Sequence, residues 1–202
     1  MGYSATVHPR TPEEKVVRVT EESPAFRYPA ARERVRDDTV DCDALDQFVK
    51  DAGRSPGKKL QVSREESIPS QIAERMGAKA AVVRRAVRLI DDRPVSVETS
   101  YYPADLATGT ELESDEDIPR GTIRVLADHG HTQVGYRDEV VPHTLDEHEA
   151  RDLTAAKGAA ALCMVRTVWS RERVLRVTTT VTPMGGDVVL CYDIGEPAPA
   201  GA

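Results

Sequence analysis

The side chains best suited to bind a small molecule lie on two strand-like runs that flank the turn-forming residues 91–94. This pattern predicts an antiparallel hairpin over residues 82–103. Pairing residues whose numbers sum to an even value separates polar from apolar side chains, and the burial of apolar surface favours that register. One face then holds Val83, Val87, Leu89, Val95, Val97 and Tyr101. The opposite face holds Arg84, Arg88, Ser96, Glu98, Ser100 and Tyr102.

The polar face of this hairpin has two interpretations. Its guanidinium groups, the Glu98 carboxylate and the hydroxyl groups together would suit an anionic or sugar-like small molecule. Antiparallel sheets also commonly keep one face in water, where Arg and Glu contribute solubility and weak ion pairs. The residue pattern leaves both interpretations open.

A second candidate site is the start of the helix predicted to begin near residue 122 and end at Gly130. Backbone N–H groups at Gly121 and Thr122, beside Arg120, would form an anion site. Alternatively, Thr122 only caps its own helix. The sequence Asp128-His129-Gly130-His131 invites a metal interpretation, but it lacks a third ligand at a telling spacing. A helix end and loop are favoured there, and we expect no metal.

No motif indicates catalysis. The sequence contains no nucleophile elbow, P-loop, dinucleotide fingerprint or HExxH element, and its Ser and His residues show no recognisable triad order. A cluster of fixed cations and hydroxyls binds better than it catalyses. We therefore expect a binding protein without a cofactor, and not an enzyme.

The composition is that of a single globular domain. The chain has 202 residues, of which 40% are hydrophobic and 30% charged, and its net charge is -7. That charge argues against nucleic-acid binding by the chain itself, because neutralising phosphates supplies most of such affinity. Cys42, Cys163 and Cys191 form no CxxC pair and suggest a reducing compartment. With no signal peptide and no long apolar run, the chain is expected to be cytoplasmic and away from membranes.

The remaining elements interleave irregularly. Residues 1–14 resemble a disordered leader, residues 15–20 a strand, and residues 23–38 a solvated linker or edge strand in preference to a nucleic-acid arm. An acidic loop at residues 104–117 would cover a pocket mouth or simply lie on the surface. Helices are predicted at residues 43–52 and 69–76. A third helix is predicted to begin at a capping box, with Thr144 as N-cap and Glu147 at N3, and to run through residue 153 to Gly158. Strands are predicted at residues 60–62, 161–169, 174–182 and 188–194, the last three forming two hairpins. This order predicts an α+β fold with an antiparallel sheet.

The run VVRRAVRLIDDRPVSVETSYYP, followed by DLATGTEL, IPRG and DHGH, resembles the UTRA domain, the effector-sensing half of HutC-type GntR transcription regulators. The resemblance extends from about Val16 to Tyr192, giving a domain over residues 15–196 and a loose tail at 197–202. It implies a chorismate-lyase-like antiparallel sheet with helices packed against it, a small-molecule effector pocket, a homodimer and a bacterial regulator. Relatives bind DNA through an upstream winged helix-turn-helix. The residues before Lys15 are too few to form one, so we expect this chain to lack it.

The resemblance also carries site residues onto this chain, with departures. An Arg-x-Arg pair common in the family is replaced here by Ala86-Val87-Arg88; His143 stands where an Arg is frequent, and Arg176 where an acidic residue is frequent. These changes disfavour phosphosugar effectors. The candidate effector-binding residues are Arg84, Arg88, Glu98, Ser100, Tyr102, Arg120, Gly121, Thr122, His143 and Arg176.

Three functions remain open. The favoured one is an effector-binding and dimerisation domain of a transcription regulator. The second is an enzyme of the chorismate-lyase type, which would release pyruvate from chorismate. The third is a binding-only partner that pairs with full-length regulators, which a pull-down with such regulators would reveal.

Overall fold

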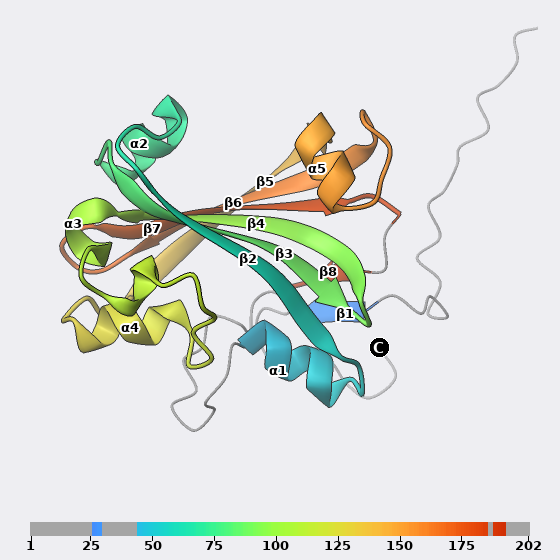
Figure 1. Cartoon of the computed structure of the whole chain (residues 1–202), viewed down its shortest axis with the longest axis horizontal. Helices are drawn as coiled ribbons and strands as arrows, with labels where there is room; N and C mark the ends of the chain where they lie inside the picture. Colours follow the sequence, from blue (N-terminus) through green and yellow to red (C-terminus); the bar gives the residue numbers. More distant parts are fainter. Residues whose placement is uncertain (1–25, 30–43, 186–187, 193–202) are drawn as a thin grey trace, which may run out of the picture.

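The computed structural model describes residues 26–29, 44–185 and 188–192. Six strands form an antiparallel sheet in the order β2-β3-β4-β7-β6-β5 (Figure 1). The strands, in that order, are Pro56–Glu65, Ala81–Ile90, Arg93–Pro103, Val174–Pro183, Ala160–Trp169 and Gly135–Thr144. Together with the helices below, this sheet confirms the predicted α+β fold.

Helices cover both faces of the sheet (Figure 1). On one face lie α2 (Ser70–Met76) and α5 (Glu147–Asp152), whose side chains pack on the apolar face of the β3–β4 hairpin. On the other lie α1 (Ala44–Asp51) and α4 (Thr122–Asp128). The acidic segment predicted as a loop contains α3 (Ala104–Ala107) and the 3-10 helix η2 (Glu111–Glu113).

The β3–β4 pairing has the predicted even-sum register from Ala81↔Pro103 to Arg88↔Ser96. Val83 and Tyr101 pack with α2, and Val87 and Val97 pack beside α5, so the apolar face is confirmed there. The register shifts between Arg88 and Leu89. This irregularity turns Val95 to the α1 side, where it packs with Ile90 and Val49, and the prediction for Val95 was wrong.

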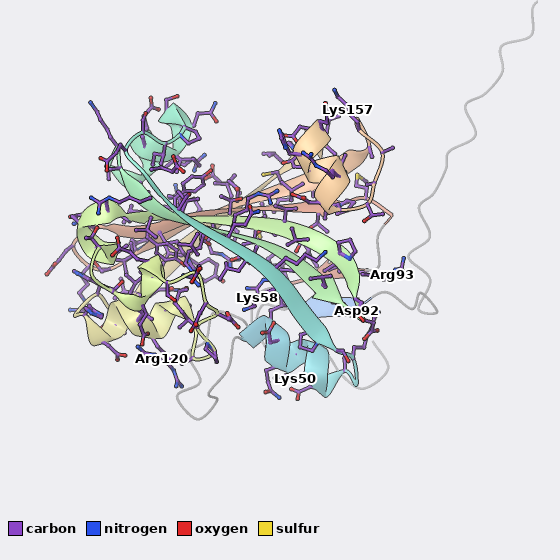
Figure 2. The ribbon with its side chains drawn as sticks, in the orientation of Figure 1. Lys50, Lys58, Asp92, Arg93, Arg120 and Lys157 are labelled. Carbon is purple, nitrogen blue, oxygen red and sulfur yellow. The ribbon has the colours of Figure 1, made fainter. Side chains whose placement is uncertain are left out.

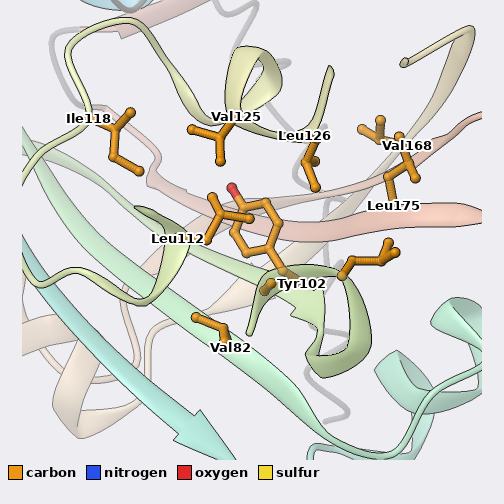
Figure 3. Close-up of a cluster of buried hydrophobic side chains, with 10 residues drawn as sticks. Val82, Tyr102, Leu112, Ile118, Val125, Leu126, Val168 and Leu175 are labelled. Atoms are coloured by element: carbon orange, nitrogen blue, oxygen red, sulfur yellow. The ribbon is translucent and has the colours of Figure 1, made fainter. Parts of the chain in front are cut away.

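The largest buried cluster lies beneath α4 (Figure 3). Tyr102 is 1% exposed and its ring lies among Leu112 of η2 and Val125 and Leu126 of α4. Burying such apolar surface contributes about 25 cal/mol per Å². The cluster therefore fixes α4 and η2 on the polar face of the hairpin.

The ends of α2 and the start of α5 can be compared with the predicted helix caps. α2 begins after Pro69 and ends at Gly77, which adopts the predicted left-handed conformation with φ 68°. The capping box of α5 was misplaced by two residues: the N-cap is Asp146 and its N3 partner is Glu149. Thr144 instead ends β5, so the helix begins later than predicted, and it ends at Asp152.

The ends of the chain supply one further correction. β8 (Val188–Cys191) pairs in parallel with β1 (Phe26–Pro29) in a separate two-stranded sheet. It forms no hairpin with β7, and it is shorter than predicted. The predicted leader, the strand at residues 15–20 and the tail lie outside the described residues.

Candidate functional site

The polar face of the β3–β4 hairpin is buried. Arg84 is 6% exposed, Arg88 8%, Ser100 3% and Tyr102 1%. Side chains in a water-facing sheet surface would be largely exposed. The solvated-face interpretation therefore does not hold for these four residues, and their polar groups must find partners inside the protein.

Arg84 holds the segment that joins η2 to α4. Its Nη1 donates to the carbonyl oxygens of Leu112 and Ser114, at 2.9 and 2.6 Å, and its Nη2 donates to that of Glu116, at 2.9 Å. Burial lowers the pKa of the guanidinium from its usual value. Arg84 therefore positions the segment above the sheet.

Arg88 lies at the centre of a charged group formed by α1, β2, β3, β4 and the segment between η2 and α4. Its Nε and Nη2 each lie 3.4 Å from Glu98 Oε2, and its Nη1 lies 3.5 Å from Asp46 Oδ1 of α1. Lys58 of β2 reaches Asp46 at 3.7 Å and Asp117 at 2.8 Å, and Figure 2 shows it between the sheet and α1. Asp46, Lys58, Arg88, Glu98 and Asp117 are called the Arg88 cluster below.

Hydroxyl groups continue the polar surface from Glu98 onto β7. Ser100 Oγ lies 3.4 Å from Glu98 Oε1 and 2.8 Å from Thr178 Oγ1. Ser100 and Thr178 are paired residues of β4 and β7, so their side chains share this face. Glu98 itself keeps 26% of its side chain exposed. A carboxylate, a guanidinium and hydroxyls at such spacing can hold a small polar molecule.

At the start of α4, where an anion site was predicted, the Thr122 hydroxyl accepts hydrogen bonds from two side chains of the sheet. Tyr102 Oη donates to Thr122 Oγ1 at 2.9 Å, and Arg176 Nη1 donates to the same oxygen at 3.2 Å. Gly121 is the N-cap, with φ 82°, and no side chain caps the helix. Thr122 does not cap its own helix; its hydroxyl joins α4 to β4 and β7.

Two predicted site residues lie away from this group. Arg120 bonds Asp128 of α4, and its Nη2 donates to Glu111 of η2 at 2.6 Å. Figure 2 shows it at the outer margin of the molecule. The Nε2 of His143 lies 2.7 Å from Glu149 of α5, on the opposite side of the sheet. The structure brings Arg84, Arg88, Glu98, Ser100, Tyr102, Gly121, Thr122 and Arg176 onto one side and separates Arg120 and His143 from them.

One charged pair on the same face was not predicted from the sequence. Arg166 of β6 donates to both carboxylate oxygens of Asp138 of β5, at 2.6 and 2.7 Å, and its guanidinium lies 5.3 Å from the centre of the Tyr136 ring. Arg166 is 5% exposed. Arg166 alternates with the partly buried Val165 and Thr167, which could have placed it on the polar face. Its partner Asp138 could not have been found in this way, because β5 was not predicted as a strand.

The histidine-containing segment lies at the C-terminal end of α4, as predicted. His129 Nδ1 lies 2.8 Å from the carbonyl oxygen of Val125. Among the described residues, no group of three or more His, Cys, Asp or Glu side chains is arranged to hold a metal ion. In the same part of the chain, no helix has the length and apolar character needed to cross a membrane.

The comparisons agree on one class of protein. The UTRA domain profile matches residues 51–184, which is more than half of the chain. The chain therefore belongs to the UTRA domain family. A search of curated proteins gives no match.

Several solved structures of transcription regulators and their effector domains share this fold. The effector domain of PhnF from Mycobacterium smegmatis aligns with a TM-score of 0.67 at 16% identity, covering 84% of this chain and 99% of that one. The C-terminal domain of the histidine utilization repressor from Pseudomonas syringae aligns with a TM-score of 0.59 at 16% identity, covering 70% and 99%. A GntR-family transcriptional regulator aligns with a TM-score of 0.71 at 18% identity, covering 85% and 70%. At these identities the alignments establish the fold, which is that of GntR regulator effector domains.

Proposed function

We propose that this chain is the small-molecule effector-binding and dimerisation domain of a bacterial, cytoplasmic transcription regulator of the HutC type in the GntR family. It is proposed to bind an effector that carries an anionic group and to catalyse no reaction. DNA would be bound by a winged-helix domain and not by this chain, whose net charge is -7.

The Arg88 cluster is the observation that supports this proposal. Arg88 is 8% exposed, yet its neighbour Glu98 keeps 26% of its side chain open to solvent. A guanidinium held between carboxylates within a mostly buried face is already oriented, so a ligand that contacts it loses little entropy in ordering the site. The hydroxyls of Ser100 and Thr178 add hydrogen-bonding groups on the same side.

The test is a thermal-shift screen of small metabolites, covering carboxylic acids, sugar phosphates and amino acids, followed by titration of each compound that stabilises the chain. Arg88→Ala should weaken binding by about 1.5 to 3 kcal/mol, the usual contribution of a hydrogen bond to a charged group. Because Arg88 is buried and contacts both Glu98 and Asp46, this variant should also lose some stability. The parent and the variant are therefore compared by their dissociation constants and not by their thermal shifts.

Arg85→Ala is the matched control. Arg85 is the same residue type on the same strand, but its Nη2 donates to Asp152 of α5, on the opposite face. This variant should bind the ligand as the parent does. If Arg88→Ala and the parent bind the same compound equally well, the assignment of the site is wrong.

A further inference from the structure

Two ion pairs on the polar face differ in how tightly they are closed. Arg166 and Asp138 meet at 2.6 and 2.7 Å with side chains 6% and 10% exposed. Arg88 meets Glu98 at 3.4 Å, and the Glu98 side chain is 26% exposed. Charge-assisted hydrogen bonds are normally 2.7 to 2.9 Å long. The Arg166 pair is therefore a closed contact, whereas the Arg88–Glu98 contact is longer and leaves more of its carboxylate exposed.

The charges of the Arg88 cluster limit what can bind there. Among the described residues, the cluster contains two cations, Lys58 and Arg88, and three carboxylates, Asp46, Glu98 and Asp117. A phosphate or dicarboxylate placed on Arg88 would lie close to Glu98 and Asp46, and like charges at short range in a partly buried site repel strongly. A ligand with one negative charge meets less repulsion, and a ligand that also carries a positive charge near Glu98 turns part of that repulsion into attraction.

If the chain is an effector-binding domain as proposed above, its ligand class follows. We infer that the Arg88 cluster binds a zwitterion whose ammonium and carboxylate are separated by one carbon, as in an α-amino acid. The carboxylate contacts Arg88 and the ammonium contacts Glu98. The Arg88 guanidinium and the Glu98 carboxylate, which would contact the two charged groups of the ligand, are only 3.4 Å apart. This short distance matches a ligand whose opposite charges are also close together. Ser100 Oγ, 3.4 Å from Glu98 Oε1, lies where it can accept from the same ammonium.

The experiment compares each protein amino acid with two analogues, one lacking the amino group and one lacking the carboxylate, and includes inorganic phosphate. Dissociation constants are measured by calorimetry for the parent chain. We expect at least one amino acid to bind at least about tenfold more tightly than both of its analogues, because each lost charge removes a charge-assisted hydrogen bond.

Two variants separate this inference from a general anion site. Glu98→Gln should weaken binding of the amino acid by about ten- to hundredfold and leave binding of its des-amino analogue unchanged or stronger. Asp152→Asn removes a carboxylate of comparable exposure on the opposite face and should behave as the parent. Circular dichroism checks that each variant is folded. For each variant, the dissociation constant of the amino acid is divided by that of its des-amino analogue, because this ratio does not depend on the variant's stability.

The inference is overturned if the des-amino analogue or phosphate binds the parent as tightly as the amino acid does. It is also overturned if Glu98→Gln leaves the amino acid's affinity unchanged, or if no amino acid binds. In each of these cases the proposed effector-binding function is judged separately, by whether any compound of the wider metabolite screen depends on Arg88.

Discussion

Replacing Arg84 by methionine should destabilise the fold far more than the same change one residue further along the strand. Arg84 is 6% exposed and donates to three backbone carbonyls between Leu112 and Glu116. Methionine keeps the apolar stem of the side chain but cannot donate. The carbonyls would then lose their donors, and the segment leading to α4 would lose its attachment to β3.

The magnitude follows from how buried each carbonyl is. Leu112 is fully buried, so its carbonyl loses a charge-assisted bond that nothing replaces, at a cost of about 1.5 to 3 kcal/mol. The carbonyls of Ser114 and Glu116 are only partly buried and can turn to water, so each costs about 0.5 to 1 kcal/mol. The Arg84→Met variant no longer buries a charged guanidinium, and this gain offsets part of the lost stability. The expected decrease in the free energy of unfolding is about 2 to 4 kcal/mol.

Urea unfolding, followed by circular dichroism and Trp169 fluorescence, measures this decrease. Arg85→Met is the control because Arg85 makes a partly exposed ion pair with Asp152 on the other face, and surface ion pairs contribute under about 1 kcal/mol. Equal losses for Arg84→Met and Arg85→Met would refute the assigned role of Arg84.

Three further predictions concern stability and assembly. Tyr102→Phe removes the hydroxyl that donates to Thr122 and should lower the free energy of unfolding by about 1 kcal/mol, measured in urea. The pKa of Asp146 is held below its usual value of 3.8 because its carboxylate accepts from the backbone N–H of Glu149. This stabilisation is present above pH 3.8 and is lost as the pH falls through the lowered pKa, so Asp146→Asn should flatten the acid side of a plot of Tm against pH; parallel plots would contradict this. Light scattering should give about twice the chain mass of 22.1 kDa, whereas a monomer at micromolar concentration would contradict the proposed homodimer.

The sequence specified the central hairpin because side-chain alternation and apolar burial determine which residues share a face. That rule cannot locate an inserted residue. The register shift at Leu89 therefore went unpredicted, and Val95 was placed on the wrong face. β5 was missed for a related reason: as an edge strand with Val140 and Val141 exposed on both of its faces, it lacks the alternation that marks a strand.

The candidate site was predicted in part. Arg88 and Glu98 were placed on one face by alternation alone, and the structure brings them into contact. Asp46 and Lys58 come from α1 and β2, and no local pattern reports which distant segments will meet. Alternation also says nothing of a side chain's partner, so Arg84 was predicted to contact ligand although it holds backbone carbonyls of its own chain.

A crystal structure of the chain with a compound from the thermal-shift screen would test the central claim most directly. We predict that the compound lies on the polar face between α1 and α4, with its anionic group in hydrogen-bonding contact with the Arg88 guanidinium and a donor group on Glu98. A compound bound instead on the α5 side of the sheet, beside His143, or over the exposed edge of β5, with the Arg88 cluster unchanged, would contradict it.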